Sequence, residues 1–301
     1  MFRILLFLIT VPLAGIGFTS FYSNENQDII EAGAKPEKLA GSFAFTEGPT
    51  SDAEGNIFFT DQPNDRIMKW STSGELSTFL QPSGRSNGLS FDSKGILWSC
   101  ADEKNELWQI DAGKKVTPVQ LTYGSKALNG PNDLWINDEG GIYLTDPYYQ
   151  RPWWIHQSMP QELQGVYYLA PDHKTMIRVI NDLVQPNGIV GTPDGKTLFV
   201  ADIGANKTWS YTINKDHTLS GKKLFCDLGS DGMTIDSKGN IYLTGQGVTI
   251  FDKSGKQTAH IDVPEDWTAN VCFGGKDMKD LFITASKGLY RIRTKVAGTK
   301  G

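Results

Sequence analysis

Cysteine and histidine, the side chains that most often bind transition metals, are scarce in this sequence. Only three cysteines and four histidines occur in 301 residues. Cys100, Cys226 and Cys272 are odd in number and far apart, which excludes a disulfide framework and a thiolate metal site. We expect all three to be small buried hydrophobic residues.

Clusters of basic residues are also missing. The formal net charge is -5, the isoelectric point is near 5.4, and no stretch concentrates Lys or Arg. Nucleic-acid binding needs such a concentration of positive charge, so we expect no nucleic-acid partner.

Long apolar runs are absent after the first residues. The run from Ile4 to Phe18 follows Arg3 and contains small residues, as a secretory signal does. We predict a signal peptide over 1–22, a polar lead-in over 23–37, and a secreted or periplasmic location. A membrane anchor is the alternative, although the run is short for a bilayer span of about 20 residues.

What the sequence does contain is a repeated phrase, in which an oxygen-bearing side chain opens a strand and a tight turn precedes a second strand. Successive openings are 40, 45, 55, 44 and 39 residues apart, which is the length of a four-stranded propeller blade. Their first residues are Glu47, Asn87, Asn132, Asn187, Asp231 and Asn270. The spacing predicts an all-β fold, a six-bladed β-propeller over 38–296.

The turns inside the repeats support this prediction. Asp52 to Asn56 leads into the apolar strand Ile57 to Asp61, and Asp92 to Gly95 leads into Ile96 to Cys100. Glycine at the end of each turn provides the positive φ of a tight hairpin, and helical periodicity is nearly absent. Lys38 to Ala40 is the expected outer strand of the sixth blade, which would close the ring.

An insertion lengthens the third repeat from Tyr148 to Gln164 and carries several aromatic residues. A loop of this length is either a lid over a site or a packed surface loop. The sequence leaves both interpretations open.

The six opening residues predict a central metal site. Equivalent positions of a radial repeat lie around one axis, so their side chains should converge at the channel mouth. Carboxylate and amide oxygens suit Ca²⁺, Mg²⁺ or Mn²⁺ better than Zn²⁺ or copper. The alternative is that Asn-Gly and Asp-Gly merely form turns, but Glu47 is a poor turn residue.

The motifs Glu47-Gly48-Pro49, Asn132-Asp133, Pro186-Asn187-Gly188 and Asp231-Gly232-Met233 resemble those of the senescence marker protein (regucalcin) and gluconolactonase family. This resemblance covers about residues 38 to 295 and implies a six-bladed propeller. It further implies that Glu47, Asn187 and Asp231 bind one divalent cation, with Asn132 as a further metal ligand or a substrate contact. Ca²⁺ is the expected ion, with Mg²⁺, Mn²⁺ and Zn²⁺ as alternatives.

One position departs from the family pattern. Regucalcin-like members carry an Arg two residues before Asn132, where this chain has Gly130. Arg85 lies two residues before Asn87 in the neighbouring repeat and could bring a guanidinium to the same mouth. We therefore predict that Asn132, Asn87 and Arg85 bind substrate.

The predicted activity is a metal-dependent hydrolase that opens a small-molecule sugar lactone such as glucono-1,5-lactone. A cation can polarise the lactone carbonyl, and Asp231 is the candidate catalytic base as well as a ligand. Two alternatives remain: an organophosphate hydrolase like diisopropyl fluorophosphatase, and a calcium-binding propeller without catalytic activity.

Overall fold

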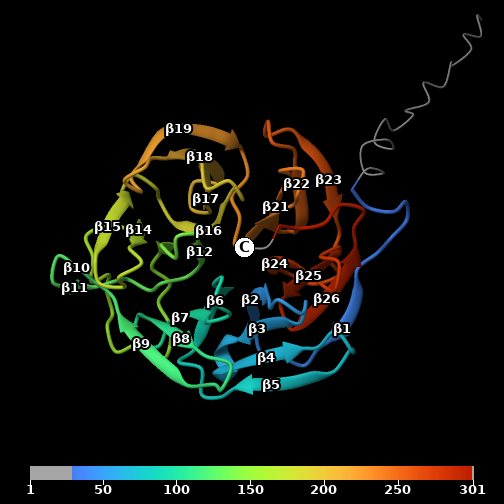
Figure 1. Cartoon of the computed structure of the whole chain (residues 1–301), viewed down its shortest axis with the longest axis horizontal. Coiled ribbons are helices and arrows are strands. Elements are labelled where there is room, and N and C mark those ends of the chain that lie inside the picture. The colour runs from blue at the N-terminus through green and yellow to red at the C-terminus, as the bar shows by residue number, and fades with distance from the viewer. Residues whose placement is uncertain (1–28, 300–301) are drawn as a thin grey trace, which may run out of the picture.

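The computed structural model describes residues 29–299, and the predicted signal segment over 1–22 lies outside this range. These residues form six four-stranded antiparallel sheets arranged radially around one axis, as the repeat predicted (Figure 1). Within residues 29–299 the only helical element is the short 3-10 turn η2 (Gln62–Asn64), and no helix is long and apolar enough to cross a membrane.

The strands of blades 1 to 3 follow one another along the chain. Blade 1 contains β2 (Thr46–Ser51), β3 (Ile57–Asp61), β4 (Arg66–Trp70) and β5 (Leu76–Leu80). Blade 2 contains β6 (Ser86–Phe91), β7 (Leu97–Ala101), β8 (Glu106–Ile110) and β9 (Val116–Gln120). Blade 3 contains β12 (Leu134–Ile136), β13 (Ile142–Asp146), β14 (Gly165–Leu169) and β15 (Met176–Ile180). A small hairpin, β10 (Thr122–Tyr123) with β11 (Lys126–Ala127), precedes blade 3.

The remaining three blades complete the circle. Blade 4 contains β16 (Pro186–Gly191), β17 (Thr197–Asp202), β18 (Lys207–Ile213) and β19 (Leu219–Cys226). Blade 5 contains β20 (Met233–Ile235), β21 (Ile241–Gly245), β22 (Gly247–Phe251) and β23 (Gln257–Ile261). Blade 6 contains β24 (Thr268–Gly274), β25 (Asp280–Ala285) and β26 (Gly288–Arg293), and β1 (Glu37–Ala40) is its outer strand.

The two ends of the ring meet in blade 6. β1 pairs antiparallel with β26, with Glu37 opposite Arg291 and Lys38 opposite Tyr290. The closing strand that we predicted at Lys38 to Ala40 is therefore present and begins one residue earlier. The innermost strands β2, β6, β12, β16, β20 and β24 each pack on their two neighbours, which closes the circle around the axis.

The folded part extends beyond the predicted limits of 38 and 296. Ile29 and Ile30, in the segment expected to be a polar lead-in, are buried among the apolar side chains of blades 5 and 6. Ile30 forms a bridge with Thr294, and Gly298 forms one with Asp236. Apolar side chains at 29 and 30 gain more from this burial than they would in water, which explains why the chain is held there.

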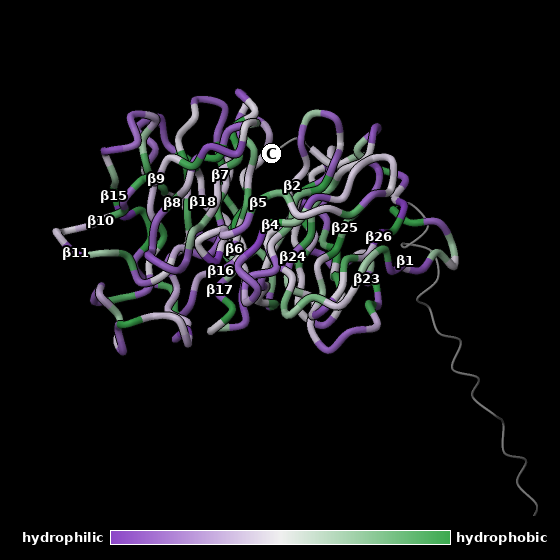
Figure 2. Tube along the Cα trace, turned by 90° about the horizontal axis from the view of Figure 1, so that it is seen from below, coloured by the Kyte–Doolittle hydropathy of each residue, from purple (hydrophilic) through white to green (hydrophobic). Residues whose placement is uncertain are grey.

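The hydrophobic core lies between neighbouring sheets. Successive side chains of a strand point to opposite faces of its sheet, so they pack against different neighbouring blades. Large apolar clusters span blades 3 to 5 and blades 5 to 6. All three cysteines are free and buried in these layers, as expected. Seen edge-on, the ring is a flattened disc with hydrophilic loops at its two faces (Figure 2).

Aspartates fix the ends of the strands. Asp61, Asp146 and Asp202 each end the second strand of a blade, and each accepts two backbone N–H groups from the segment that precedes its blade. The turn aspartates act similarly: Asp52 Oδ1 accepts from the backbone of Glu54 and Asn56. These carboxylates therefore hold the backbone.

Candidate metal centre and active site

The opening residues of the blades lie on the axis because each begins, or immediately precedes, an innermost strand. Backbones approach closely there: a Cβ on Gly48 would lie 2.1 Å from the carbonyl oxygen of Asn87, and the Gly88 amide donates to the carbonyl oxygen of Asn132. Gly48 also has a φ of +46°, which favours glycine. The Glu-Gly and Asn-Gly pairs thus let adjacent blades touch while the first residue of each pair faces the axis.

Glu47, Asn187 and Asp231 form the centre of the candidate site. Glu47 is 4% exposed and Asn187 is 1% exposed. Asn187 Nδ2 donates to Asp231 Oδ1 at 2.8 Å, so blades 4 and 5 are joined directly at this point. Glu47 Oε2 accepts from the Gly48 amide at 2.9 Å.

The two carboxylates perturb each other. Burial raises the pKa of Glu47 well above its ordinary value, and the nearby charge of Asp231 raises it further. Burial likewise raises the pKa of Asp231 to about 6, against the hydrogen bonds from Trp267 and Asn187. Glu47 and Asp231 therefore share one region whose negative charge is only partly balanced by the protein.

Asn87 and Asn132 belong to the same ring of opening residues and are buried, at 3% and 5% exposure. Across residues 29–299, neither side-chain amide has a hydrogen-bond partner. Both amides are therefore available to a bound molecule.

Asn270 behaves differently from the other opening residues. Its Oδ1 accepts from the Val271 amide, and its Nδ2 lies 3.4 Å from Asp133 Oδ2. Asp133 and Asn270 line a cavity that opens on the opposite face, which none of the candidate ligands lines. Of the six opening residues that the sequence predicted, Asn270 alone lines this opposite cavity.

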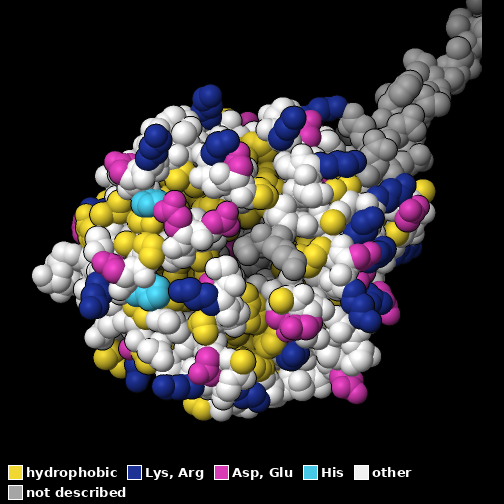
Figure 3. All heavy atoms as spheres, in the orientation of Figure 1, with side chains coloured by type: hydrophobic (Ala, Val, Ile, Leu, Met, Phe, Trp, Pro, Cys, Tyr) yellow, Lys and Arg dark blue, Asp and Glu magenta, His cyan; other side chains and the backbone are white. Residues whose placement is uncertain are grey.

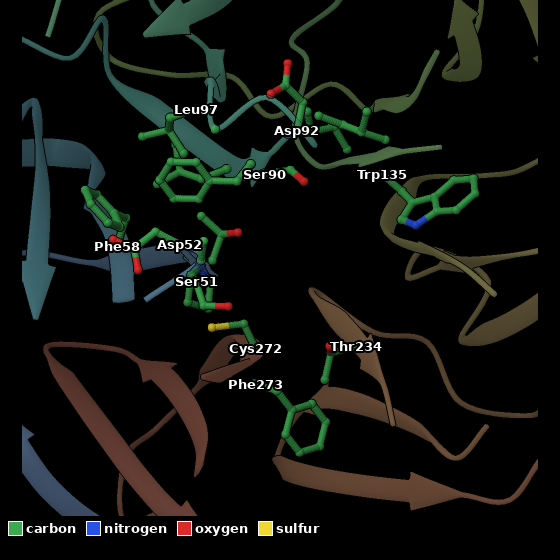
Figure 4. Close-up of a pocket in the computed structure, with 18 of the residues that line it drawn as sticks. Ser51, Asp52, Phe58, Ser90, Asp92, Leu97, Trp135, Thr234, Cys272 and Phe273 are labelled. Carbon is green, nitrogen blue, oxygen red and sulfur yellow. The ribbon is translucent and has the colours of Figure 1, made fainter. Parts of the chain in front are cut away.

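This opposite cavity has a volume of about 820 Å³, and Figure 4 shows part of its lining. Asp52 and Asp92 border it, but their carboxylates already accept hydrogen bonds from their own turns. The face it opens on carries basic and acidic side chains interspersed around the centre (Figure 3). Because the carboxylates of Asp52 and Asp92 already hold their own turns, they are less available to a ligand than the carboxylate pair on the other side.

Several residues of the site were missed by the sequence reasoning. Trp267 Nε1 donates to Asp231 Oδ2 at 2.6 Å, and the hydroxyl of Tyr149 accepts from Asn187 Nδ2 at 2.9 Å. Arg151 is near enough for its charge to lower the pKa of both Glu47 and Asp231. Tyr149 and Arg151 belong to the insertion of blade 3, so the structure favours the lid interpretation for this part of the loop.

Arg85 lies at the outer edge of this mouth. Its Nη1 donates to the carbonyl oxygen of Pro63 at 2.6 Å, and its guanidinium stacks 4.7 Å from the ring centre of Trp153. Arg85 therefore contacts the insertion rather than the carboxylate pair.

No three His, Cys, Asp or Glu side chains between residues 29 and 299 form a cluster that would hold a metal ion. The candidate ligands instead combine two carboxylates with amides. Their fit to a hard cation is supported by Asn187, whose buried Oδ1 has no hydrogen-bond partner within this range. A divalent cation would bind this oxygen and would offset the charge of both carboxylates.

Comparison with known proteins agrees with this fold. Residues 45–287 match the model of the SMP-30/Gluconolactonase/LRE-like region, so the chain belongs to this family. A gluconolactonase of Zymomonas mobilis is 29% identical over 94% of this chain and 88% of its own length.

Two solved structures illustrate the same fold. A gluconolactonase from Xanthomonas campestris has a TM-score of 0.80 at 26% identity, with 87% of this chain and 89% of that chain covered. The regucalcin of Agrobacterium tumefaciens, described as a calcium-binding protein, has a TM-score of 0.75 at 19% identity. It covers 88% of this chain and 96% of its own, and at this identity the likeness shows the fold alone.

Proposed function

We propose that the protein is a divalent-cation-dependent lactonase that opens sugar lactones at the mouth formed by Glu47, Asn187 and Asp231. One observation carries the proposal: the buried carboxylate of Glu47 in blade 1 and the partly buried carboxylate of Asp231 in blade 5 lie together beside an amide oxygen that lacks a partner. The lactonases and gluconolactonases among the relatives support the choice of substrate class.

The proposed cation ligands are Glu47, Asn187 and Asp231, with Asn132 as a fourth ligand or a substrate contact. All are oxygen donors, and two carboxylates match the charge of one divalent ion. Ca²⁺ is the first choice, with Mg²⁺, Mn²⁺ and Zn²⁺ as alternatives. When bound, such a cation supplies Lewis-acid polarisation of a carbonyl oxygen.

The chain's own residues do the rest of the proposed chemistry. Asp231 accepts the proton of the water that attacks the lactone carbonyl carbon and returns a proton to the ring oxygen as the ring C–O bond breaks, which gives a hydroxy acid. Trp267 and Asn187 hold one carboxylate oxygen each, and each oxygen keeps a second lone pair. The two hydrogen bonds thereby fix the orientation of the base.

Asn87 and Asn132 are the proposed substrate contacts nearest the ring, because their amides are buried and without protein partners. Arg85 remains a predicted contact at the outer edge, through its stack on Trp153. Secretion into the cell envelope, inferred from the predicted signal peptide, is part of the proposal.

The direct test is acid release from glucono-1,5-lactone, followed in a pH-stat with background hydrolysis subtracted. Diisopropyl fluorophosphate is the second substrate, and each assay is run with Ca²⁺, Mg²⁺, Mn²⁺ or Zn²⁺ and with a chelator. We expect lactone opening that the chelator abolishes and a cation restores. Turnover of the organophosphate alone would favour the phosphotriesterase alternative, and turnover of neither substrate would favour a non-catalytic calcium-binding propeller.

A further inference from the structure

The insertion of blade 3 fills space at the candidate mouth that a side chain at position 130 would otherwise occupy. A Cβ on Gly130 would lie 2.6 Å from Trp154 Cη2 and 3.3 Å from Asp102 Oδ1. Trp154 is 5% exposed, and its Nε1 donates to the carbonyl oxygen of Asp102 at 2.7 Å. A side chain at position 130 is therefore excluded by the packed insertion.

The same insertion places a guanidinium nearby. Arg151 Nε lies 3.3 Å from Asp102 Oδ2, and the guanidinium carbon lies 5.3 Å from the ring centre of Tyr149 and 5.8 Å from that of Trp153. Arg85 stacks on the same Trp153. These contacts fix the Arg151 side chain before any ligand arrives, so little conformational entropy is lost on binding.

Arg151 retains unused donors at the mouth. Its side chain is 23% exposed, and its terminal nitrogens donate no hydrogen bond to a residue within 29–299. Tyr149, on which it stacks, contacts Asn187 of the candidate metal ligands. A molecule bound over Glu47 and Asp231 would therefore meet these donors.

We propose that Arg151 is the specificity-determining residue that donates hydrogen bonds to the hydroxyl oxygens of a polyhydroxylated lactone. The inference rests on the proposed function and deepens it, because it assigns the substrate class to a residue of the insertion. A planar guanidinium with free N–H groups binds pairs of neighbouring oxygens, which a sugar lactone offers and an unsubstituted lactone ring does not.

A structural role for Arg151, in which it only anchors the loop to Asp102, makes a different prediction. Loss of a loop anchor would impair all lactones equally, whereas loss of a hydroxyl contact would impair only the hydroxylated ones. The experiment therefore compares glucono-1,5-lactone with δ-valerolactone, which has the same ring without hydroxyl groups. The variants are Arg151→Met and Arg151→Lys in the full-length chain loaded with Ca²⁺.

Arg178 provides a matched control on the same blade. It also stacks on a tyrosine, 4.8 Å from the ring centre of Tyr123, and also pairs with a carboxylate, that of Glu162. Ile155, on the insertion itself and 98% exposed, controls for changes in the loop. Arg178→Met and Ile155→Ala should keep the wild-type ratio of the two lactone activities.

We expect Arg151→Met to lower kcat/KM for glucono-1,5-lactone roughly ten- to hundredfold, mostly through KM, since hydrogen bonds to charged donors have about this effect. Its loss for δ-valerolactone should be smaller by about tenfold or more, and Arg151→Lys should recover part of the difference. Calorimetry of gluconate and 5-hydroxypentanoate should show the same selective loss in binding.

Equal losses for both lactones, or no loss for either, would overturn the role of Arg151 while leaving the lactonase intact. A wild-type chain that opens neither lactone with any of the four cations would overturn the proposed function, and this inference with it.

Discussion

Replacing Asp231 by Asn should make the cation-free protein more stable, although most substitutions of buried polar residues destabilise a fold. The reason is that Asp231 is buried near a second carboxylate, Glu47, so its ionised form is disfavoured. The asparagine side chain introduced at position 231 can keep both contacts. Its oxygen accepts the hydrogen bond from Trp267. If the Asn187 amide rotates by 180°, its Oδ1, which has no partner in the wild type, accepts from the new NH₂ group.

The pKa of Asp231 gives the size of the effect. Burial raises this pKa from 3.8 to about 6. Each pKa unit corresponds to about 1.4 kcal/mol, so ionised Asp231 destabilises the cation-free fold by about 3 kcal/mol above pH 6. The pKa of Asp231 is higher in the folded state than in the unfolded state. The loss of unfolding free energy relative to the variant is therefore absent below about pH 4, grows between pH 4 and 6, and stays constant above pH 6.

Thermal unfolding in EDTA at pH 7.5 is the assay. In a domain of this size each kcal/mol corresponds to roughly 2 °C, so we expect Asp231→Asn to raise Tm by about 6 °C. Addition of Ca²⁺ at a hundred times its Kd should stabilise the wild type by about 2.7 kcal/mol, and the variant much less.

Asp202→Asn is the control because Asp202 is a buried aspartate in blade 4 that lies outside the candidate site. Its carboxylate accepts backbone N–H groups from Val184 and Gln185 instead of facing another acid. This variant should lose stability and keep the Ca²⁺-dependent rise in Tm. An Asp231→Asn protein that is less stable in EDTA, or that keeps the full Ca²⁺ response, would refute the reasoning.

Three further predictions concern neighbouring positions. Trp267→Phe removes the donor to Asp231 Oδ2, so kcat for glucono-1,5-lactone should fall about tenfold, and an unchanged kcat would contradict the positioning role. Gly232→Ala would place a Cβ 1.9 Å from Asn270 Cγ, so urea unfolding should show a loss of about 1–3 kcal/mol; an unchanged midpoint would contradict this close packing. Burial lowers the pKa of His173, so the wild type should lose stability as the pH falls below 6.5; His173→Asn, which tolerates the φ of +55°, should show a smaller loss in Tm between pH 7 and 5.

The fold could be predicted from the sequence because the blades repeat. The spacing from Glu47 to Asn270 defined six repeats. The apolar segments that follow the turns, such as Ile57 to Asp61, are the second strands of their blades. Even the closing strand before the first blade was identified, since a ring of blades needs a partner for its last sheet. The small hairpin β10–β11 was not predicted, because two-residue strands carry too few side chains to form a pattern.

The candidate site was only partly accessible to the same reasoning. Radial symmetry brings Glu47 and Asp231 together from opposite parts of the chain, and this could be anticipated. The contacts of Arg151, Tyr149 and Trp267 could not, because irregular loops supply them and no period relates a loop residue to the axis. The departure from the family pattern at Gly130 directed attention to Arg85, and only the structure shows that Trp154 packs against Gly130.

The pairing of β1 with β26 has a consequence for biosynthesis. The sixth sheet joins a strand near residue 40 to one near residue 290, so it cannot assemble until almost the whole polypeptide has left the ribosome. Until then the first blade lacks its neighbour on one side, and the apolar side chains of that flank stay exposed to other molecules. Shortening the protein at either end beyond these two strands would therefore open the circle, and the damage would reach a complete blade instead of a single strand.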